Sequence, residues 1–290
     1  MHGLLRTAGR LPLGFHYSFS KFFAWILSKC MLYRKGVVYI NFARAFPEKK
    51  YWEIDQLVRA FYQHFGEIVA ETIWFAAADD ARLRKQKICT VTNPEVLAKA
   101  YADSPNVMLM TSHCGNWELL GGIRSYNDDS RYDSLFDKDH LYIVYKQQSS
   151  ALWDEVLKRN RTAPIPGFNG LVETKKVLRF VLENRKQKSI YVFIADQSPY
   201  ATKTEVGEFM HQQTKGMLGS FGLAHKLGMA VVYSKMVRTE RGHYDITFVP
   251  LVDDASKYAP EDIMVMYFRE LEKELSDTPA NWLWSHKRWK

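Results

Sequence analysis

Five short apolar runs, separated by segments with helical periodicity, constrain the fold of this chain more than any other feature. We predict buried strands at 106–111, 141–145, 189–195, 229–235 and 244–249. We predict helices at 115–124, 149–161, 170–183, 215–227 and 260–275. Strands that alternate with helices form α/β folds in which helices cover both faces of the sheet. The sequence therefore predicts an α/β fold with a mixed, mainly parallel sheet flanked by helices.

The first 35 residues are basic and apolar, and no small-residue cleavage site of a secretory signal follows them. The stretch 11–33 approaches the roughly 20 residues that span a bilayer, but it is interrupted by His16, Lys21 and Lys29. Helical spacing gathers its apolar side chains on one face, namely Phe15, Phe19, Phe22, Phe23, Ile26, Leu27 and Cys30. We predict a membrane-associated amphipathic segment over 1–35, lying on the membrane, and one α/β domain over 36–290. The alternative is a helix packed on the protein's own core.

The net charge of +8 predicts an anionic partner of some kind. Nucleic acid is the weakest candidate, because the sequence has no zinc finger, RNP motif or basic helical stripe. Anionic lipid and an acidic protein remain as candidates. The three cysteines are far apart and odd in number, which argues against a disulfide framework and is compatible with a reducing cytosol.

The motif LMTSHCGNWELLGG places His113 in the loop after a buried strand and Glu118 five positions later. A loop between a strand and a helix puts its side chains at the carboxyl edge of the sheet, where α/β proteins build their sites. Histidine suits proton transfer near neutral pH, and a carboxylate can hold its ring in the reactive tautomer. We predict that His113 and Glu118 are catalytic; the alternative is a structural histidine paired with a helix-capping glutamate.

Two other chemistries of this motif are less favoured. Cys114 would be a nucleophile beside a histidine, but adjacent residues in extended chain point to opposite sides, so it is a poor partner for His113. A metal site would need a second ligand at a suitable spacing from His113, and the motif has none. We therefore predict no metal site.

Five blocks of the sequence resemble, in the same order, those of the lipid A biosynthesis acyltransferases, the late acyltransferases within the wider glycerophosphate acyltransferase group. The block SHCGNWE is similar to the family's His-x-x-x-x-Asp/Glu motif. The other four are RKGVVYINFARAFPEK, VYKQQSSALWDEVLKRNR, YVFIADQSP and TPANWLWSHKRWK. The resemblance runs over nearly the whole chain.

The resemblance implies an acyltransferase at the cytoplasmic face of the bacterial inner membrane. It implies transfer from an acyl thioester, usually an acyl carrier protein, to a hydroxyl of a lipid A precursor, with no cofactor. His113 would be the general base and Glu118 its orienting partner. Two alternatives stay open: another acceptor, such as a lysophospholipid, an aminolipid or a glycolipid, and a catalytically inactive membrane adaptor. Retention of both His113 and Glu118 argues against the adaptor.

Three further residues are expected to bind substrate. Lys146 follows a predicted strand and would stabilise the developing oxyanion; the alternative is a solvated surface lysine. Asp196 and Gln197 follow another strand at the same edge, where they would either bind acceptor hydroxyls or brace the loop.

The sequence departs from the family pattern at two positions. Lys146 stands where relatives often carry arginine, and lysine lacks the bidentate fork of arginine. His211 stands where relatives commonly carry the glycine of a Phe-x-Gly turn, so we expect a pocket of different shape. In the last block, Trp282 and Trp284 lie among cations, which suits a lipid headgroup layer, although packing on the domain is the alternative.

Overall fold

A seven-stranded sheet forms the centre of the molecule in the computed structural model, which describes residues 2–148, 150–198 and 204–289. The strand order is β1-β9-β8-β2-β5-β3-β4. The bounds are β1 Cys89–Val91, β2 Val107–Thr111, β3 Leu141–Tyr145, β4 Leu171–Glu173, β5 Ile190–Ile194, β8 Ala230–Glu240 and β9 His243–Val252. Strands β8 and β9 are antiparallel, and the other neighbouring pairs are parallel. The predicted mixed, mainly parallel sheet is confirmed.

The five predicted strands correspond to β2, β3, β5, β8 and β9. Strands β1 and β4 have three residues each, which is too short for a periodic signal. A separate polar hairpin of β6 Thr204–Phe209 and β7 Gln212–Gly216 was not predicted either. Its turn residues, Met210 and His211, both have positive φ, at 51° and 59°. The family glycine would adopt this geometry freely, because it has no Cβ to clash with the following carbonyl.

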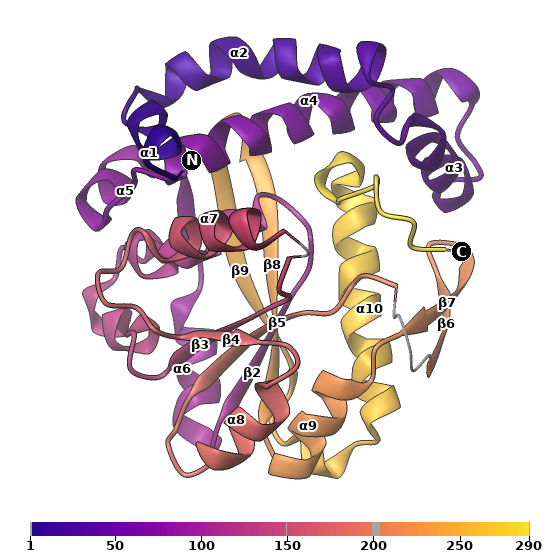
Figure 1. The fold of residues 1–290 in the computed structure, drawn as a ribbon. Helices are drawn as coiled ribbons and strands as arrows, with labels where there is room; N and C mark the ends of the chain where they lie inside the picture. Colours follow the sequence, from indigo (N-terminus) through magenta and orange to yellow (C-terminus); the bar gives the residue numbers. More distant parts are fainter. Residues whose placement is uncertain (1, 149, 199–203, 290) are drawn as a thin grey trace.

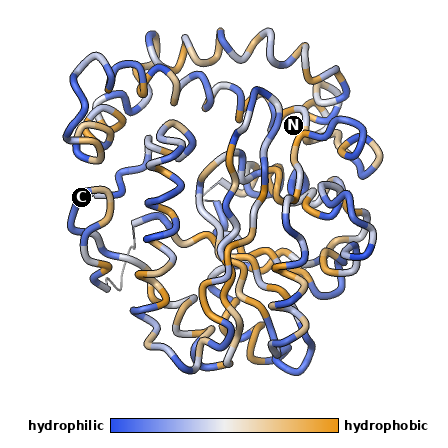
Figure 2. Tube along the Cα trace, turned by 180° about the vertical axis from the view of Figure 1, so that it is seen from behind, coloured by the Kyte–Doolittle hydropathy of each residue, from blue (hydrophilic) through white to orange (hydrophobic). Residues whose placement is uncertain are grey.

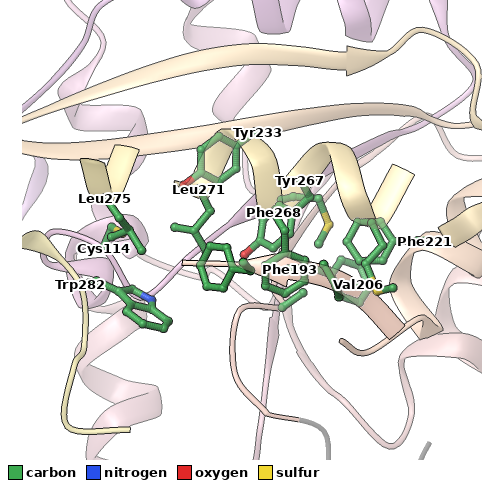
Figure 3. Packing of buried hydrophobic residues seen from close by; sticks show 14 of the residues in the cluster. Cys114, Phe193, Val206, Phe221, Tyr233, Tyr267, Phe268, Leu271, Leu275 and Trp282 are labelled. Carbon is green, nitrogen blue, oxygen red and sulfur yellow. The ribbon is translucent and has the colours of Figure 1, made fainter. Parts of the chain in front are cut away.

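Both faces of the sheet are buried, and strand β2 shows this most clearly. Met108 and Met110 pack in one cluster with Tyr267, part of which appears in Figure 3. Val107 and Leu109 pack in a second cluster on the opposite face. The central strands are accordingly the most continuously hydrophobic part of the trace in Figure 2. The helices around the sheet are α5 Asp80–Gln86, α6 Pro94–Asp103, α7 Ala151–Thr162, α8 Val177–Glu183, α9 Gly219–Leu227 and α10 Pro260–Asp277.

Several short segments adopt tighter helical turns. The helix predicted at 115–124 is a 3₁₀ helix, η2, over Trp117–Tyr126. Gly121 in η2 lies so close to α7 that a Cβ there would be 2.0 Å from the Arg161 carbonyl oxygen. Glycine therefore lets η2 and the end of α7 approach closely. The other such segments are η3 Ser130–Phe136, η4 Ala255–Lys257 and η5 Pro279–Asn281. The helix predicted at 149–161 is α7, and its first predicted residue lies outside the described residues.

The N-terminal helices form a layer along one end of the sheet. In Figure 1, α2 (Leu13–Trp25) lies side by side with α4 (Tyr51–Phe75). The contact is close, because a Cβ on Gly66 of α4 would be 2.6 Å from the Ser20 carbonyl oxygen. The remaining members are α1 His2–Gly9, the π-helical turn η1 Ile26–Cys30 and α3 Lys35–Ala45. Within the described residues, no helix is both long and apolar enough to cross a bilayer.

One face of α2 is buried against the domain and the opposite face is exposed. The face against α4 buries Leu13, His16, Ser20 and Ala24. The opposite face leaves about half of each of three aromatic side chains exposed: Phe15 at 47%, Phe19 at 46% and Phe22 at 54%. The helix is thus packed on the domain through Leu13, His16, Ser20 and Ala24 and presents Phe15, Phe19 and Phe22 outward.

Candidate active site

His113 and Asp196 meet at the carboxyl edge of the sheet. Strands β2 and β5 are parallel neighbours in which Thr111 is opposite Ile194, so the second residue after each strand lies side by side. The Nδ1 atom of His113 is 2.7 Å from Oδ1 of Asp196. The backbone N–H of His113 donates to Oδ2 of the same carboxylate at 3.1 Å. One aspartate therefore fixes both the ring and the backbone of the histidine.

Asp196 is completely buried, whereas the His113 side chain keeps 18% of its surface exposed. Burial by itself disfavours the charged carboxylate, but the imidazole of His113 and the hydrogen bond from Trp282 outweigh it. The pKa of Asp196 consequently lies below its ordinary value. A buried carboxylate on Nδ1 favours the tautomer that carries its proton on Nδ1, which leaves a lone pair on Nε2.

Gln197 and Trp117 complete the surroundings of the imidazole. The amide nitrogen of Gln197 is 3.2 Å from His113 Nε2, where it can donate to the lone pair. The ring of Trp117 packs edge-on against the imidazole, with centroids 4.9 Å apart. The structure therefore brings Asp196 and Gln197 directly to His113, in contacts that brace the ring.

Glu118 does not supply the orienting contact that we expected of it. Its carboxylate accepts two hydrogen bonds from the Arg161 guanidinium, at 2.7 and 2.8 Å, and one from Trp117 Nε1 at 3.2 Å. The predicted His113–Glu118 pair is thus replaced by His113–Asp196, because the turn of η2 directs Glu118 toward α7. Glu118 is linked to the histidine through Trp117, which donates to its carboxylate and packs against the imidazole.

Cys114 lies on the opposite side of the chain from the histidine, as the alternation of extended residues predicts. It is buried in the core cluster beside Trp282, as Figure 3 shows. Burial raises the pKa of the Cys114 thiol well above its ordinary value, and the Glu274 carboxyl adds to this effect. A buried, protonated thiol is a poor nucleophile.

Lys146 directly follows β3, the strand on the far side of β5 from β2. It therefore lies at the same sheet edge as His113 and Asp196, and its side chain is exposed. Its role at the oxyanion stays a prediction. Within residues 2–148, 150–198 and 204–289, no His, Cys, Asp and Glu side chains cluster as metal ligands would.

A buried glutamate of α4 supports the loop from the other side. Glu71 accepts hydrogen bonds from Asn116 at 2.8 Å, Tyr244 at 2.8 Å and Tyr17 at 2.7 Å. Burial raises the pKa of Glu71 to about 7, against the effect of these three donors. Sequence reasoning missed this residue, because a single glutamate in a long amphipathic helix resembles a solvated one.

The C-terminal segment also contacts the loop. The backbone N–H of Gly115 donates to the Asn281 carbonyl at 2.9 Å, and that of Leu283 donates to the His113 carbonyl at 3.1 Å. Gly115 has φ of +60° and packs against Met236, where a Cβ would be 2.8 Å from its side chain. Trp282 and Trp284 are 2% and 0% exposed, so they pack on the domain and do not face a headgroup layer.

The chain matches the family described as bacterial lipid A biosynthesis acyltransferase, over residues 1–290. A comparison with curated proteins gives no match. Because the family match spans the whole sequence, this chain belongs to the bacterial lipid A biosynthesis acyltransferase family.

Proposed function

We propose that this acyltransferase moves a fatty acyl group from an acyl thioester, carried by an acyl carrier protein, to a hydroxyl of a lipid A precursor. Family membership supports acyl transfer in general. The observation that carries the mechanism is the 2.7 Å contact between His113 Nδ1 and the buried Asp196. It leaves the lone pair of Nε2, which faces the Gln197 amide, as the proton acceptor.

In the proposed reaction, His113 Nε2 takes the proton from the acceptor hydroxyl as the oxygen attacks the thioester carbonyl. A C–O bond forms, and the carbonyl oxygen becomes an oxyanion that needs positive charge or N–H donors nearby. Lys146 is our candidate for that charge. Collapse of the intermediate breaks the C–S bond, and the imidazolium returns its proton to the departing thiolate. Asp196 stabilises the imidazolium throughout and stays ionised.

The test is the mass of candidate lipids after incubation with the protein and an acylated carrier protein. We expect a lipid A precursor to gain one acyl chain, whereas lysophospholipids, aminolipids and glycolipids supplied in parallel stay unchanged. The variant His113→Ala should lose activity by at least a factor on the order of 10² to 10⁴ while keeping its thermal transition. Acylation of a different lipid would refute the proposed acceptor. Full activity of a folded His113→Ala protein would refute the role of His113 as general base.

We also propose that the exposed aromatic face of α2 lies in the cytoplasmic leaflet of the bacterial inner membrane. Phe15 contacts Phe19 with centroids 5.0 Å apart, and Phe22 stacks on Trp25 at 6.1 Å, so the exposed rings form two apolar pairs along the helix. Cations flank it: Arg6, Arg10, Lys21, Lys29, Arg34 and Lys35. Each basic residue near an anionic leaflet contributes about 1 kcal/mol.

Point variants on this face test the proposal better than deletion, because Tyr17 of α2 donates to the buried Glu71 and deletion would break that contact. We expect replacement of Phe15, Phe19 and Phe22 by serine to abolish flotation with liposomes that contain anionic lipid. A matched control is Leu178→Ser, since Leu178 is 55% exposed on α8, away from α2. Unchanged flotation of the folded triple variant would show that the membrane contact lies elsewhere.

A further inference from the structure

Trp282 joins the C-terminal segment to the catalytic pair. Its indole Nε1–H donates to Asp196 Oδ2 at 2.7 Å. Asp196 thus accepts three hydrogen bonds: one on Oδ1 from the imidazole, and two on Oδ2 from the His113 backbone and from Trp282. The charged acceptor makes each of these bonds stronger than a bond between neutral groups.

The indole itself is held in place by other aromatic rings. Trp284 packs edge-on against Trp282 with centroids 4.9 Å apart, and Trp289 packs at 5.9 Å. Phe209 of the β6–β7 hairpin contacts it from another direction at 6.1 Å. Two backbone hydrogen bonds between 113–115 and 281–283 fix the chain on either side of it. The direction of the N–H is therefore set by packing.

We propose that Trp282 is a positioning residue for the acyl transfer reaction: it fixes the rotation of the Asp196 carboxylate so that Oδ1 faces His113 Nδ1. This inference rests on the proposed role of His113 as base. The terminal torsion of an aspartate is broad and roughly two-fold, so burial alone does not choose the plane of the carboxylate. An N–H donor that is held by packed aromatic rings fixes the plane of the carboxylate. Trp282 touches no reacting atom and acts through Asp196.

The decisive comparison uses two buried indoles that differ in what their N–H binds. Trp282→Phe keeps an aromatic ring and removes the donor to Asp196. Trp284→Phe is the matched control: it keeps an aromatic ring against Trp282, Trp284 is about equally buried, and the N–H that it removes donates to the Pro279 carbonyl at 2.6 Å. We expect Trp282→Phe to lower kcat about tenfold with KM within about twofold. Trp284→Phe should keep kcat within about twofold.

A double-mutant cycle then tests whether Trp282 acts through Asp196. If it does, Trp282→Phe should lower kcat no further in an Asp196→Asn background, because the carboxylate that it positions is already gone. A double variant whose loss of kcat equals the product of the two single-variant losses would overturn the proposal. If Asp196→Asn falls below detection, equal kcat losses in Trp282→Phe and Trp284→Phe overturn it instead.

A spectroscopic readout separates this inference from the proposed function. The Nδ1 proton of His113, identified by the loss of its NMR signal in His113→Ala, reports the contact with Asp196 without any turnover. We expect this signal to broaden or move upfield in Trp282→Phe and to stay in place in Trp284→Phe. An unchanged signal in Trp282→Phe refutes the positioning role. A changed signal in a protein whose His113→Ala variant still turns over refutes only the proposed base.

Discussion

The substitution Asp196→Asn tests the catalytic pair with the smallest change of shape. The side chain of asparagine has the same size as that of aspartate, but only one of its two terminal atoms accepts hydrogen bonds. In the native protein, Oδ2 accepts two donors and Oδ1 accepts one. The carboxamide should therefore keep its oxygen at the position with two donors and turn its NH₂ group toward His113 Nδ1.

This arrangement reverses the roles of the two ring nitrogens. Nδ1 becomes an acceptor, so the ring proton moves to Nε2, and the nitrogen that faces the acceptor hydroxyl can no longer take a proton. In a serine protease, the same replacement beside a catalytic histidine lowers kcat by about 10⁴. We expect a loss of about 10³ to 10⁴ in kcat here, which corresponds to roughly 4 to 5.5 kcal/mol of transition-state stabilisation.

The assay is acyl transfer from an acylated carrier protein to the identified acceptor under saturating conditions, beside a thermal melt of each variant. Glu118→Gln is the internal comparison, because the carboxylate of Glu118 binds Arg161 and Trp117. We expect it to cost far less than Asp196→Asn, about tenfold. If Asp196→Asn kept kcat within about tenfold of wild type, or if Glu118→Gln cost more, the assignment of Asp196 as the orienting partner would be wrong.

Two predictions concern stability. His211→Gly should raise the free energy of unfolding by about 1 kcal/mol, because His211 has φ of +59° and the left-handed region costs residues other than glycine roughly 1–2 kcal/mol. Burial raises the pKa of Glu71 from 4.5 to about 7, so its protonated form is favoured in the folded protein. The resulting stabilisation is fully present below pH 4.5 and is lost as pH rises toward about 7. Glu71→Gln should reduce this decline by about 1.4 kcal/mol per pH unit.

Both are measured by denaturant unfolding. For the turn, Gln212→Gly is the control, since Gln212 begins strand β7 and glycine weakens a strand. A less stable His211→Gly protein would show that the side chain contributes more than the left-handed conformation costs. For the pH dependence, Glu155→Gln removes an exposed carboxylate and should leave the slope unchanged. An unchanged slope in Glu71→Gln would mean that Glu71 is ionised in the folded protein throughout this range.

The central strands could be predicted because their signal is local. Runs such as 107–111 and 190–194 are buried on both faces, so they are almost entirely apolar and can be recognised one at a time. The three-residue strands β1 and β4 offer too few residues for any periodicity. In the hairpin of β6 and β7, Phe209 packs on the rings of Phe268 and Trp282, which are distant in sequence, and no local pattern reports such packing.

The candidate active site was likewise predictable only in part from the sequence. The position of His113 at a strand end, and of Asp196 and Gln197 at another, followed from the sequence. That Asp196 lies beside His113, 83 positions earlier in the chain, depends on the pairing of β2 with β5. The motif SHCGNWE pairs His113 with Glu118, which lies five positions away. The true partner of Glu118, Arg161, is 43 positions away and is reached through the close approach of η2 and α7 at Gly121.

The sequence by itself determined the α/β class, the order of the main strands and helices, the family, and the histidine at the sheet edge. These depend on hydrophobic periodicity and on motifs a few residues long, which are written in consecutive positions. Only the tertiary structure decided that Asp196 holds His113, that Glu118 holds Arg161, and that Trp282 reaches the catalytic pair from the C-terminal segment. Each of these contacts joins residues from different elements, and strand order and helix packing, which place such residues together, are properties of the whole chain.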